Sequence, residues 1–288
     1  MKGLFGFSVV EFIRKRKRAH WISLGLKSKQ IQLNNGTSLH CWVLQSNNPE
    51  KLENQRPTLL LLHGFGADGV MGWDTKICAL GKHFDLLIPD LIFFGDSTTT
   101  SSERSDIFQA ECMKNMVEYL GVENVIVVGH SYGGFVAFWM AHNYPNVVRR
   151  LVIVSSAICM TPSTNDPLLK ELGTSDIKEL LLPNNARDLK IAFSFTFYKI
   201  PWLPAFIYED LLQVEYSKCL YADFSARIFH RNILKDYLNS LDFYLNSWKA
   251  GEQNREQKVQ LADGIVVGSK NSQAMPTINQ VTGFFAIP

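Results

Sequence analysis

The stretch Gly129-His130-Ser131-Tyr132-Gly133-Gly134 decides how this chain of 288 residues is interpreted. It follows an apolar run at 125–128 and precedes a segment with helical character at 135–143. A serine in G-x-S-x-G between a strand and a helix stands on a sharp turn that lifts its hydroxyl off the sheet. Glycine suits the outer positions, Gly129 and Gly133, because neighbouring backbone comes too close for a Cβ atom. The motif therefore predicts that Ser131 is a nucleophile.

A second glycine-containing stretch supplies part of what such a nucleophile needs. His63-Gly64-Phe65-Gly66 follows the apolar run at 58–62. A serine hydroxyl is a weak nucleophile at neutral pH, so it requires a base and hydrogen-bond donors for the oxyanion. We expect the backbone N–H groups of Phe65 and Tyr132 to be those donors, with Gly64 and Gly66 shaping the loop.

The same loop also fits a different motif. Gly64, Gly66 and Gly69 satisfy G-x-G-x-x-G after a strand, and Asp85 and Asp90 lie near the distance of a ribose-binding acid. That pattern is a dinucleotide-binding fingerprint. Two observations count against it. A β-hairpin precedes the supposed first strand, and the serine turn provides chemistry that a second nucleotide-binding half would leave unexplained.

Strands and helices alternate through the first half of the chain. Asn35-Gly36 between two alternating segments predicts a hairpin. Buried strands are expected at 58–62, 86–88, 125–128 and 151–154, separated by helix-length segments at 73–82, 107–120 and 132–144. This order predicts an α/β fold with a mostly parallel sheet and helices on both faces. From about 159 to 258 the alternation stops, and an aromatic-rich helical insertion is expected, its rings forming either core or the wall of an apolar pocket.

Composition limits the class of protein. The chain is 46% hydrophobic and 19% charged, which suits a globular protein with a large core. A net charge of +2 gives no long-range attraction to nucleic acid. Five cysteines without CxxC or Cys/His pairing argue against a disulfide framework or a zinc site. We expect free thiols in a reducing compartment, an intracellular and cytoplasmic location, and no metal or cofactor.

The N-terminal arm, residues 1–27, combines apolar and basic segments. Residues 1–13 are rich in apolar side chains, and the basic run Arg14-Lys15-Arg16-Lys17-Arg18 follows. A secretory signal carries its main charge before the apolar part, so the order is wrong for one, and no stretch is long enough to span a membrane. Two interpretations remain: a frayed, solvated arm, or an amphipathic segment that makes peripheral contact with an anionic membrane.

Three motifs in order resemble the α/β-hydrolase superfamily: His63 to Gly66, Asp90 to Ser97, and Gly129 to Gly134. The chain looks most like plant hydrolases similar to monoacylglycerol lipases. The resemblance implies an eight-stranded sheet, a helical cap between strands six and seven, and hydrolysis of small-molecule esters or lipids by a Ser-Asp-His set. It carries Asp96 over as a structural acid, without a catalytic role. A serine at the nucleophile position disfavours epoxide hydrolases and dehalogenases, which depend on aspartate.

The family pattern breaks after the cap. The implied domains are a core at 28–157, a cap at 158–260 and a divergent tail at 261–288, and no G-x-x-D or Gly-His segment follows the cap. Asp166, in a polar loop, is a weak candidate for the acid, with a solvated surface residue as the alternative. His230 in the cap is the remaining candidate for the base. We infer that the chain is truncated before strands seven and eight, as a splice variant or gene-model artefact.

Two functional classes follow from this pattern. The first is a serine hydrolase scaffold for esters or lipids whose catalytic set is incomplete in this chain. Loss of a triad member leaves about 10³–10⁴-fold catalysis over water, from binding and the oxyanion hole. The second is a non-catalytic ligand-binding or regulatory protein. A chain that does not fold stably is a third alternative, because the strand at 151–154 would be a bare hydrophobic edge unless tail segments at 265–267 and 284–287 cover it.

Overall fold

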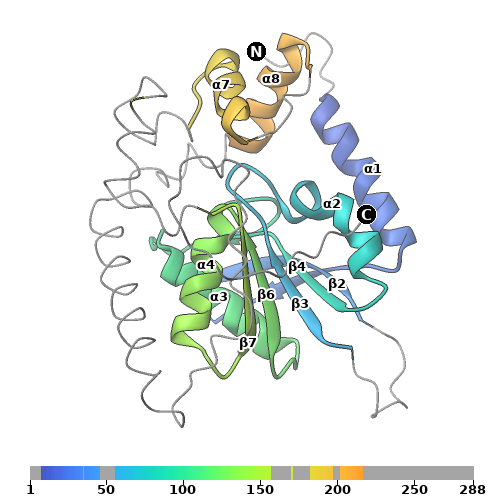
Figure 1. Ribbon diagram of the computed structural model, residues 1–288, viewed down its shortest axis with the longest axis vertical. Helices are drawn as coiled ribbons and strands as arrows, with labels where there is room; N and C mark the ends of the chain where they lie inside the picture. The colour runs from blue at the N-terminus through green and yellow to red at the C-terminus, as the bar shows by residue number, and fades with distance from the viewer. Residues whose placement is uncertain are drawn as a thin grey trace, which may run out of the picture.

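The computed structural model describes residues 8–34, 36–45, 56–156, 170, 182–196 and 202–216. Within them a seven-stranded sheet forms the centre of the molecule (Figure 1). Its strands are β1 (Lys27–Gln32), β2 (Thr37–Leu44), β3 (Thr58–Leu62), β4 (Asp85–Pro89), β5 (Thr98–Thr99), β6 (Val125–His130) and β7 (Val148–Val154). The order is β1-β2-β4-β3-β6-β7, with β5 paired to β2.

The sheet has a parallel centre and an antiparallel flank. β4, β3, β6 and β7 run parallel, whereas β2 is antiparallel to both β1 and β4. All four parallel strands lie where the sequence predicts them, and β1 and β2 form the expected antiparallel pair. The predicted α/β architecture is therefore confirmed for the described part of the chain.

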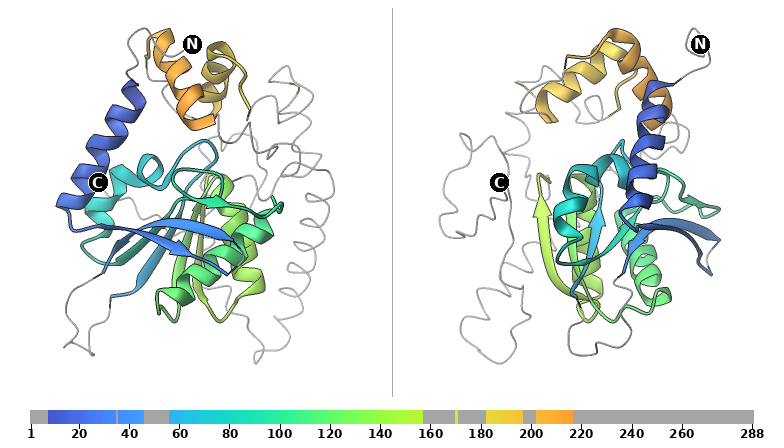
Figure 2. Two further views of the ribbon diagram at one scale, coloured as in Figure 1. Left: turned by 180° about the vertical axis from the view of Figure 1, so that it is seen from behind. Right: turned by 90° about the vertical axis from the view of Figure 1, so that its right-hand side faces the viewer.

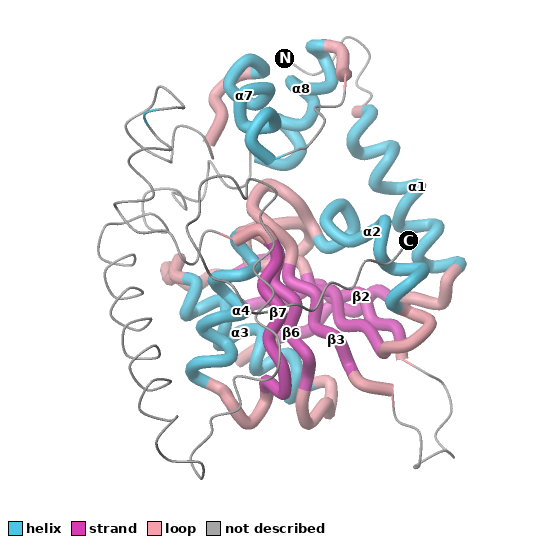
Figure 3. The backbone as a smooth tube through the Cα atoms, viewed as in Figure 1, coloured by secondary structure: helices cyan, strands magenta, loops and turns pink. Residues whose placement is uncertain are grey.

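Helices cover both faces of the sheet, as Figures 1 and 2 show. They are α1 (Val9–Ser23), α2 (Gly69–Leu80), α3 (Asp106–Tyr119) and α4 (Tyr132–Asn143). Three further segments lie beyond the strand ends: α7 (Ala186–Thr196), α8 (Ala205–Leu211) and the π-helical turn η2 (Leu212–Tyr216) (Figure 3). α1 and α2 pack on one face, and α3 and α4 on the other.

Burial on both faces of the sheet explains why β3 is apolar from Leu59 to Leu62. Leu60 and Leu62 belong to the core shared with α3 and α4, whereas Leu59 and Leu61 belong to the core shared with α1 and α2. Because successive side chains of a strand point to opposite faces, a strand covered on both sides must be apolar at every position. β3 pairs in parallel with β6, with Leu62 opposite Gly129, so the carboxyl ends of the two strands lie side by side.

Most of the N-terminal arm is a helix packed on the sheet, and not the frayed, solvated arm that was one of the two interpretations of its sequence. Residues 9–23 form helix α1, so the solvated arm does not hold for them. Ser8 accepts a hydrogen bond from the Glu11 N–H at 3.0 Å, and Trp21 is fully buried against the sheet. Ser-x-x-Glu before an apolar residue is the sequence sign of a helix start, and it was available at residues 8–11.

Helix α2 also begins earlier than the sequence pattern suggests. It starts at Gly69 and not near 73, because the Asp68 side chain accepts from the Met71 N–H at 2.7 Å and caps the helix. Asp68 lies two residues after the glycine loop of residues 63–66. The cap therefore fixes the end of that loop.

The described part of the predicted insertion is helical. α7 and α8 pack together, and the rings of Phe193 and Tyr208 lie 5.8 Å apart. Trp202 and Phe206 are instead exposed, at 87% and 59%. Asp166, His230 and the tail at 261–288 lie outside the described residues. In the described residues no helix is long and apolar enough to cross a membrane.

Candidate active site

Ser131 occupies a strained turn between β6 and α4. Its backbone has φ 53° and ψ −118°, which L-residues rarely adopt. The Ser131 N–H donates to the Val154 carbonyl at 2.9 Å, which ties the turn to the end of β7. The serine side chain makes no capping hydrogen bond to α4. The turn therefore presents the hydroxyl at the carboxyl edge of the sheet instead of using it to start the helix.

The glycines around this serine are needed for close backbone approach. A Cβ on Gly133 would lie 2.5 Å from the carbonyl oxygen of Leu62, and one on Gly129 would lie 2.3 Å from the carbonyl oxygen of Gly133. Real Cβ atoms essentially never come so close to backbone. Both positions therefore require glycine for the reason that the motif suggests.

The glycine loop after β3 lies against the serine turn. A Cβ on Gly64 would be 3.1 Å from that of Ser131. The Phe65 ring packs edge-on to Tyr132, with centroids 6.2 Å apart, and to Phe94, at 5.3 Å. Phe65 and Tyr132, the two predicted oxyanion donors, therefore belong to segments that pack together beside Ser131. With Phe94, the two rings form an aromatic cluster that belongs to the core.

His63 holds this loop in place. Its Nδ1–H donates to the Gly64 carbonyl at 2.8 Å, and its Nε2 accepts from the Leu91 N–H at 2.9 Å. Burial lowers the pKa of His63, which favours the neutral ring that this pattern requires. Because both ring nitrogens are occupied, His63 is structural and cannot serve Ser131 as a base.

Asp90 is the buried acid of the neighbouring loop. Its carboxylate accepts from His40 Nδ1 at 2.8 Å, from the Gly69 N–H at 2.9 Å and from the Asp96 N–H at 2.9 Å. Burial alone would raise the pKa of Asp90, but the hydrogen bond from His40 holds it below its ordinary value. The sequence suggests Asp90 as a ribose-binding acid and as the first residue of the Asp90 to Ser97 motif, but no local pattern shows that three segments converge on it.

Asp96, the acid expected to be structural, is exposed and pairs with Arg18 of α1 at 2.9 Å. Oxygen or nitrogen atoms of His40, Asp90 and Asp96 lie within 4.8 Å of one another, a spacing that could hold a metal ion. The His40–Asp90 hydrogen bond and the Asp96–Arg18 pair already engage these groups. The expectation of no metal and no cofactor stays a prediction.

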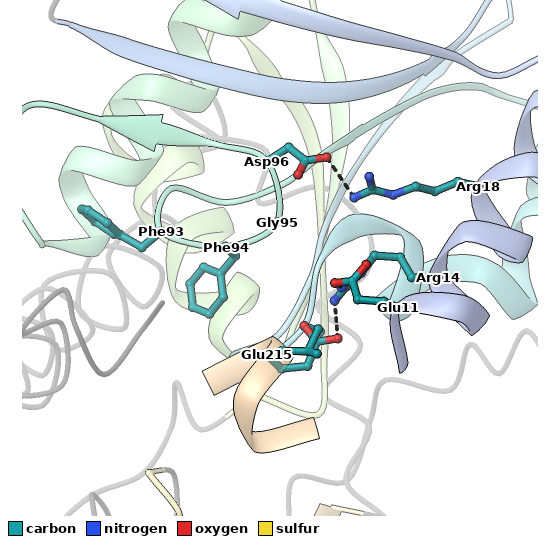
Figure 4. Close-up of a pocket in the computed structure, with 10 residues that line it drawn as sticks. Glu11, Arg14, Arg18, Phe93, Phe94, Gly95, Asp96 and Glu215 are labelled. Carbon is teal, nitrogen blue, oxygen red and sulfur yellow. Dashed lines mark hydrogen bonds and ion pairs between the residues drawn. The ribbon is translucent and has the colours of Figure 1, made fainter. Parts of the chain in front are cut away.

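A polar cavity of about 90 Å³ is lined by residues of α1, of η2 and of the loop at 93–96 (Figure 4). Arg14 of α1 is 6% exposed and pairs with Glu11, with Asp68 at 2.7 Å and with Glu215 of η2. The Val10 N–H also donates to Asp210 at 2.8 Å. α1 thus joins the segment at 202–216 to the loop that carries Phe65.

No described histidine is placed to act as the base for Ser131. His40 and His63 are held by hydrogen bonds elsewhere. His130 has its ring 6.5 Å from that of Trp73, on the α2 side of the sheet. His142 stacks on Phe138 in the last turn of α4, about 16.5 Å along the helix from the serine. The two other described histidines are exposed at 20 and 83.

Comparison with known proteins places these observations in a family context. Residues 57–187 match the family described as alpha/beta hydrolase fold. Lipase 1 of Psychrobacter immobilis is 34% identical over 149 residues, which cover 51% of this chain and 45% of that protein. The chain spans between about a third and a half of the length of such curated relatives.

Solved structures agree on the fold. A membrane phospholipase A described as a bacterial virulence factor is 27% identical, with a TM-score of 0.58, and the match covers 77% of this chain and 66% of that one. The epoxide hydrolase CorEH is 23% identical with a TM-score of 0.52, over 73% of this chain and 77% of that one. The second likeness concerns the fold alone.

Proposed function

This chain belongs to the α/β-hydrolase superfamily, and we propose that it is a serine ester hydrolase scaffold with Ser131 as its nucleophile. The observation that carries the proposal is the positive φ of Ser131 at the junction of β6 and α4. Strain of this kind persists only where the surrounding structure enforces it, and Gly129 and Gly133 show that it does here. A serine nucleophile suits esters better than epoxides.

The proposed chemistry is acyl transfer. Ser131 Oγ attacks the ester carbonyl, and the N–H groups of Phe65 and Tyr132 stabilise the oxyanion. Each such donor contributes about 10²–10³-fold to the rate. A base must take the hydroxyl proton, and the described histidines do not supply one. Asp166 and His230 stay candidates for the acid and base, and the catalytic set is proposed to be incomplete in this chain.

The proposed substrates are small esters or lipids. The loop at Phe65 packs through its ring on Tyr132 and Phe94, so the surroundings of the proposed nucleophile are rich in apolar side chains, which suits an acyl chain. Relatives named as lipase and phospholipase support the same class. We propose no nucleic-acid partner, and an intracellular, cytoplasmic location.

The test is site-resolved labelling with a fluorophosphonate probe. The probe is added to the intact chain, the digest is analysed by mass spectrometry, and Ser131→Ala serves as the control. Label on Ser131 that disappears in the variant supports the nucleophile and shows that a base exists. An unlabelled Ser131, in a chain whose melting temperature rises with an ester that stays unhydrolysed, supports the non-catalytic alternative.

We further propose that α1 makes peripheral contact with an anionic membrane. Its outward face exposes Phe12, Ile13 and Ile22 together with Lys15 and Arg16. Apolar and basic side chains on one face favour the surface of a negatively charged bilayer. Flotation with phosphatidylcholine vesicles, with and without phosphatidylserine, tests this contact. Phe12→Ser should reduce binding to the anionic vesicles, and equal recovery of both proteins would contradict it.

A further inference from the structure

A second serine of this chain is hydrogen-bonded to a histidine and an aspartate, away from the turn at residue 131. Ser28 Oγ lies 2.8 Å from His40 Nε2, and His40 Nδ1 lies 2.8 Å from Asp90 Oδ2. An activated serine lies within about 2.6–3.2 Å of a base, and an acid in turn orients that base. Ser28 belongs to β1, His40 to β2, and Asp90 follows β4.

The hairpin register creates this arrangement. Ser28 pairs with Trp42, and Gln30 pairs with His40, so Ser28 and His40 are diagonal neighbours on one face of the antiparallel pair. His40 is 4% exposed and Asp90 is 1% exposed, whereas Ser28 is exposed at the edge strand. The base and acid are therefore held rigidly, and the hydroxyl stays accessible.

The hydrogen bonds also set the protonation pattern. Asp90 accepts from two backbone N–H groups, those of Gly69 and Asp96, as well as from His40. An acceptor of three hydrogen bonds is an ionised carboxylate, so His40 donates through Nδ1–H. In the neutral ring Nε2 is then the acceptor, and the Ser28 hydroxyl donates to it. The His40 backbone is fixed as well, since its N–H donates to Ser97 Oγ at 2.9 Å.

We propose that Ser28 is a second reactive serine, which activated acyl or phosphonyl electrophiles modify with His40 as general base and Asp90 as the residue that orients it. With a fluorophosphonate, a bond forms between Ser28 Oγ and phosphorus as the P–F bond breaks. The hydroxyl proton passes to His40 Nε2 and leaves with fluoride as HF. With 4-nitrophenyl acetate, the acetyl group moves to Ser28 and 4-nitrophenol is released.

The position of Ser28 limits this chemistry to a single turnover. Ser28 lies within a strand, whereas Ser131 stands at a strand–helix turn, the setting in which backbone N–H groups form an oxyanion hole. Without such a turn the tetrahedral intermediate lacks the stabilisation that sustains turnover on ordinary esters. We therefore expect one equivalent of covalent product with activated reagents.

The experiment is a time course of fluorophosphonate labelling on the full chain, read serine by serine. All rate measurements use the Ser131→Ala protein, so that the proposed nucleophile at residue 131 contributes no label. Ser23 and Ser38 serve as internal controls, because their hydroxyls contact a backbone carbonyl and glutamine amides and not a histidine. We expect Ser28 to be labelled at least 10²-fold faster than either control, the lower end of general-base catalysis.

His40→Gln, made in the Ser131→Ala protein, should remove most of the difference in labelling rate between Ser28 and the control serines. Thermal melting checks that this double variant is folded. Labelling of Ser28 no faster than Ser23 and Ser38 overturns the proposal without any buried substitution. A rate at Ser28 that survives His40→Gln in a folded protein overturns the role of the base. Label on Ser28 with none on Ser131 in the unmodified chain supports this inference while refuting the proposed nucleophile.

Discussion

Glu215→Gln tests how the protonation of a buried glutamate controls the docking of the segment at 202–216 on α1. The Glu215 side chain is 8% exposed and contacts Arg14 (Figure 4). Burial raises the pKa of Glu215 to about 8, although the charge of Arg14 lowers it. Asp68 and Glu11 pair with the same guanidinium, and their negative charges, like that of Asp90, raise the pKa further.

The sign of the pH effect follows from comparing the segment docked on α1 with the same segment detached from it. In the detached segment Glu215 has its ordinary pKa of 4.5, whereas in the docked segment it keeps its proton up to about pH 8. The docked state therefore binds one more proton between these values. Its stability is fully present below pH 4.5 and falls by about 1.4 kcal/mol per pH unit until the docked pKa is reached. From pH 6 to pH 8 the loss is about 2 kcal/mol, or roughly 50-fold in the open population.

Hydrogen exchange of the amides in α8 and η2 measures this opening. After correction for intrinsic exchange, protection in the unmodified chain should fall roughly 50-fold between pH 6 and pH 8. Glu215→Gln keeps a neutral side chain at every pH, so its protection should be flat. Glu209→Gln, the same change at an exposed site of α8, should keep the slope of the unmodified chain. Equal slopes in both variants, or flat protection in the unmodified chain, would refute the reasoning.

Two further predictions concern stability, measured by chemical denaturation. Gly133→Ala should cost about 3 kcal/mol, because its Cβ would lie 2.5 Å from a carbonyl oxygen of β3. Gly121→Ala has no atom within 4 Å and should cost only about 1 kcal/mol, from its positive φ. Trp21→Ala should cost about 4 kcal/mol, because the side chain is fully buried. Ile22→Ala, at 61% exposed, should change stability by about 0.5 kcal/mol or less. Similar losses within either pair would show that the described packing is wrong.

The sequence predicts the sheet well because its strands carry a strong local signal. The run at 59–62 is apolar at every position, since both faces of β3 are covered. Helix starts are predicted less well, because they depend on single caps. Asp68 begins α2 several residues before the apolar pattern, and the pair at Ser8 and Glu11 begins α1 in a segment dominated by charge. These caps are visible in the sequence, but only once the helix is suspected.

The candidate site also has one part that a local sequence motif predicts and another part that it does not. Ser131 and its glycines are neighbours in the chain, so a local motif finds them. Asp90 and His40 are 50 residues apart and meet only through the strand order β2-β4. Arg14 and Glu215 are 201 residues apart, and no local pattern pairs a basic run with a distant glutamate. Long-range polar contacts of this kind follow from topology, which periodicity does not specify.

The two serines carry complementary parts of one catalytic device. Ser131 has the strained turn and neighbouring N–H groups, but no base among the described residues reaches it. Ser28 has an oriented base and a buried acid, but stands in a strand without such a turn. Because a hydrolase needs both parts at one serine, total labelling of the protein cannot distinguish a catalytic site from a reactive surface residue. The position of the label decides the matter: on Ser131 it requires a base from outside the described residues, and on Ser28 it requires only His40.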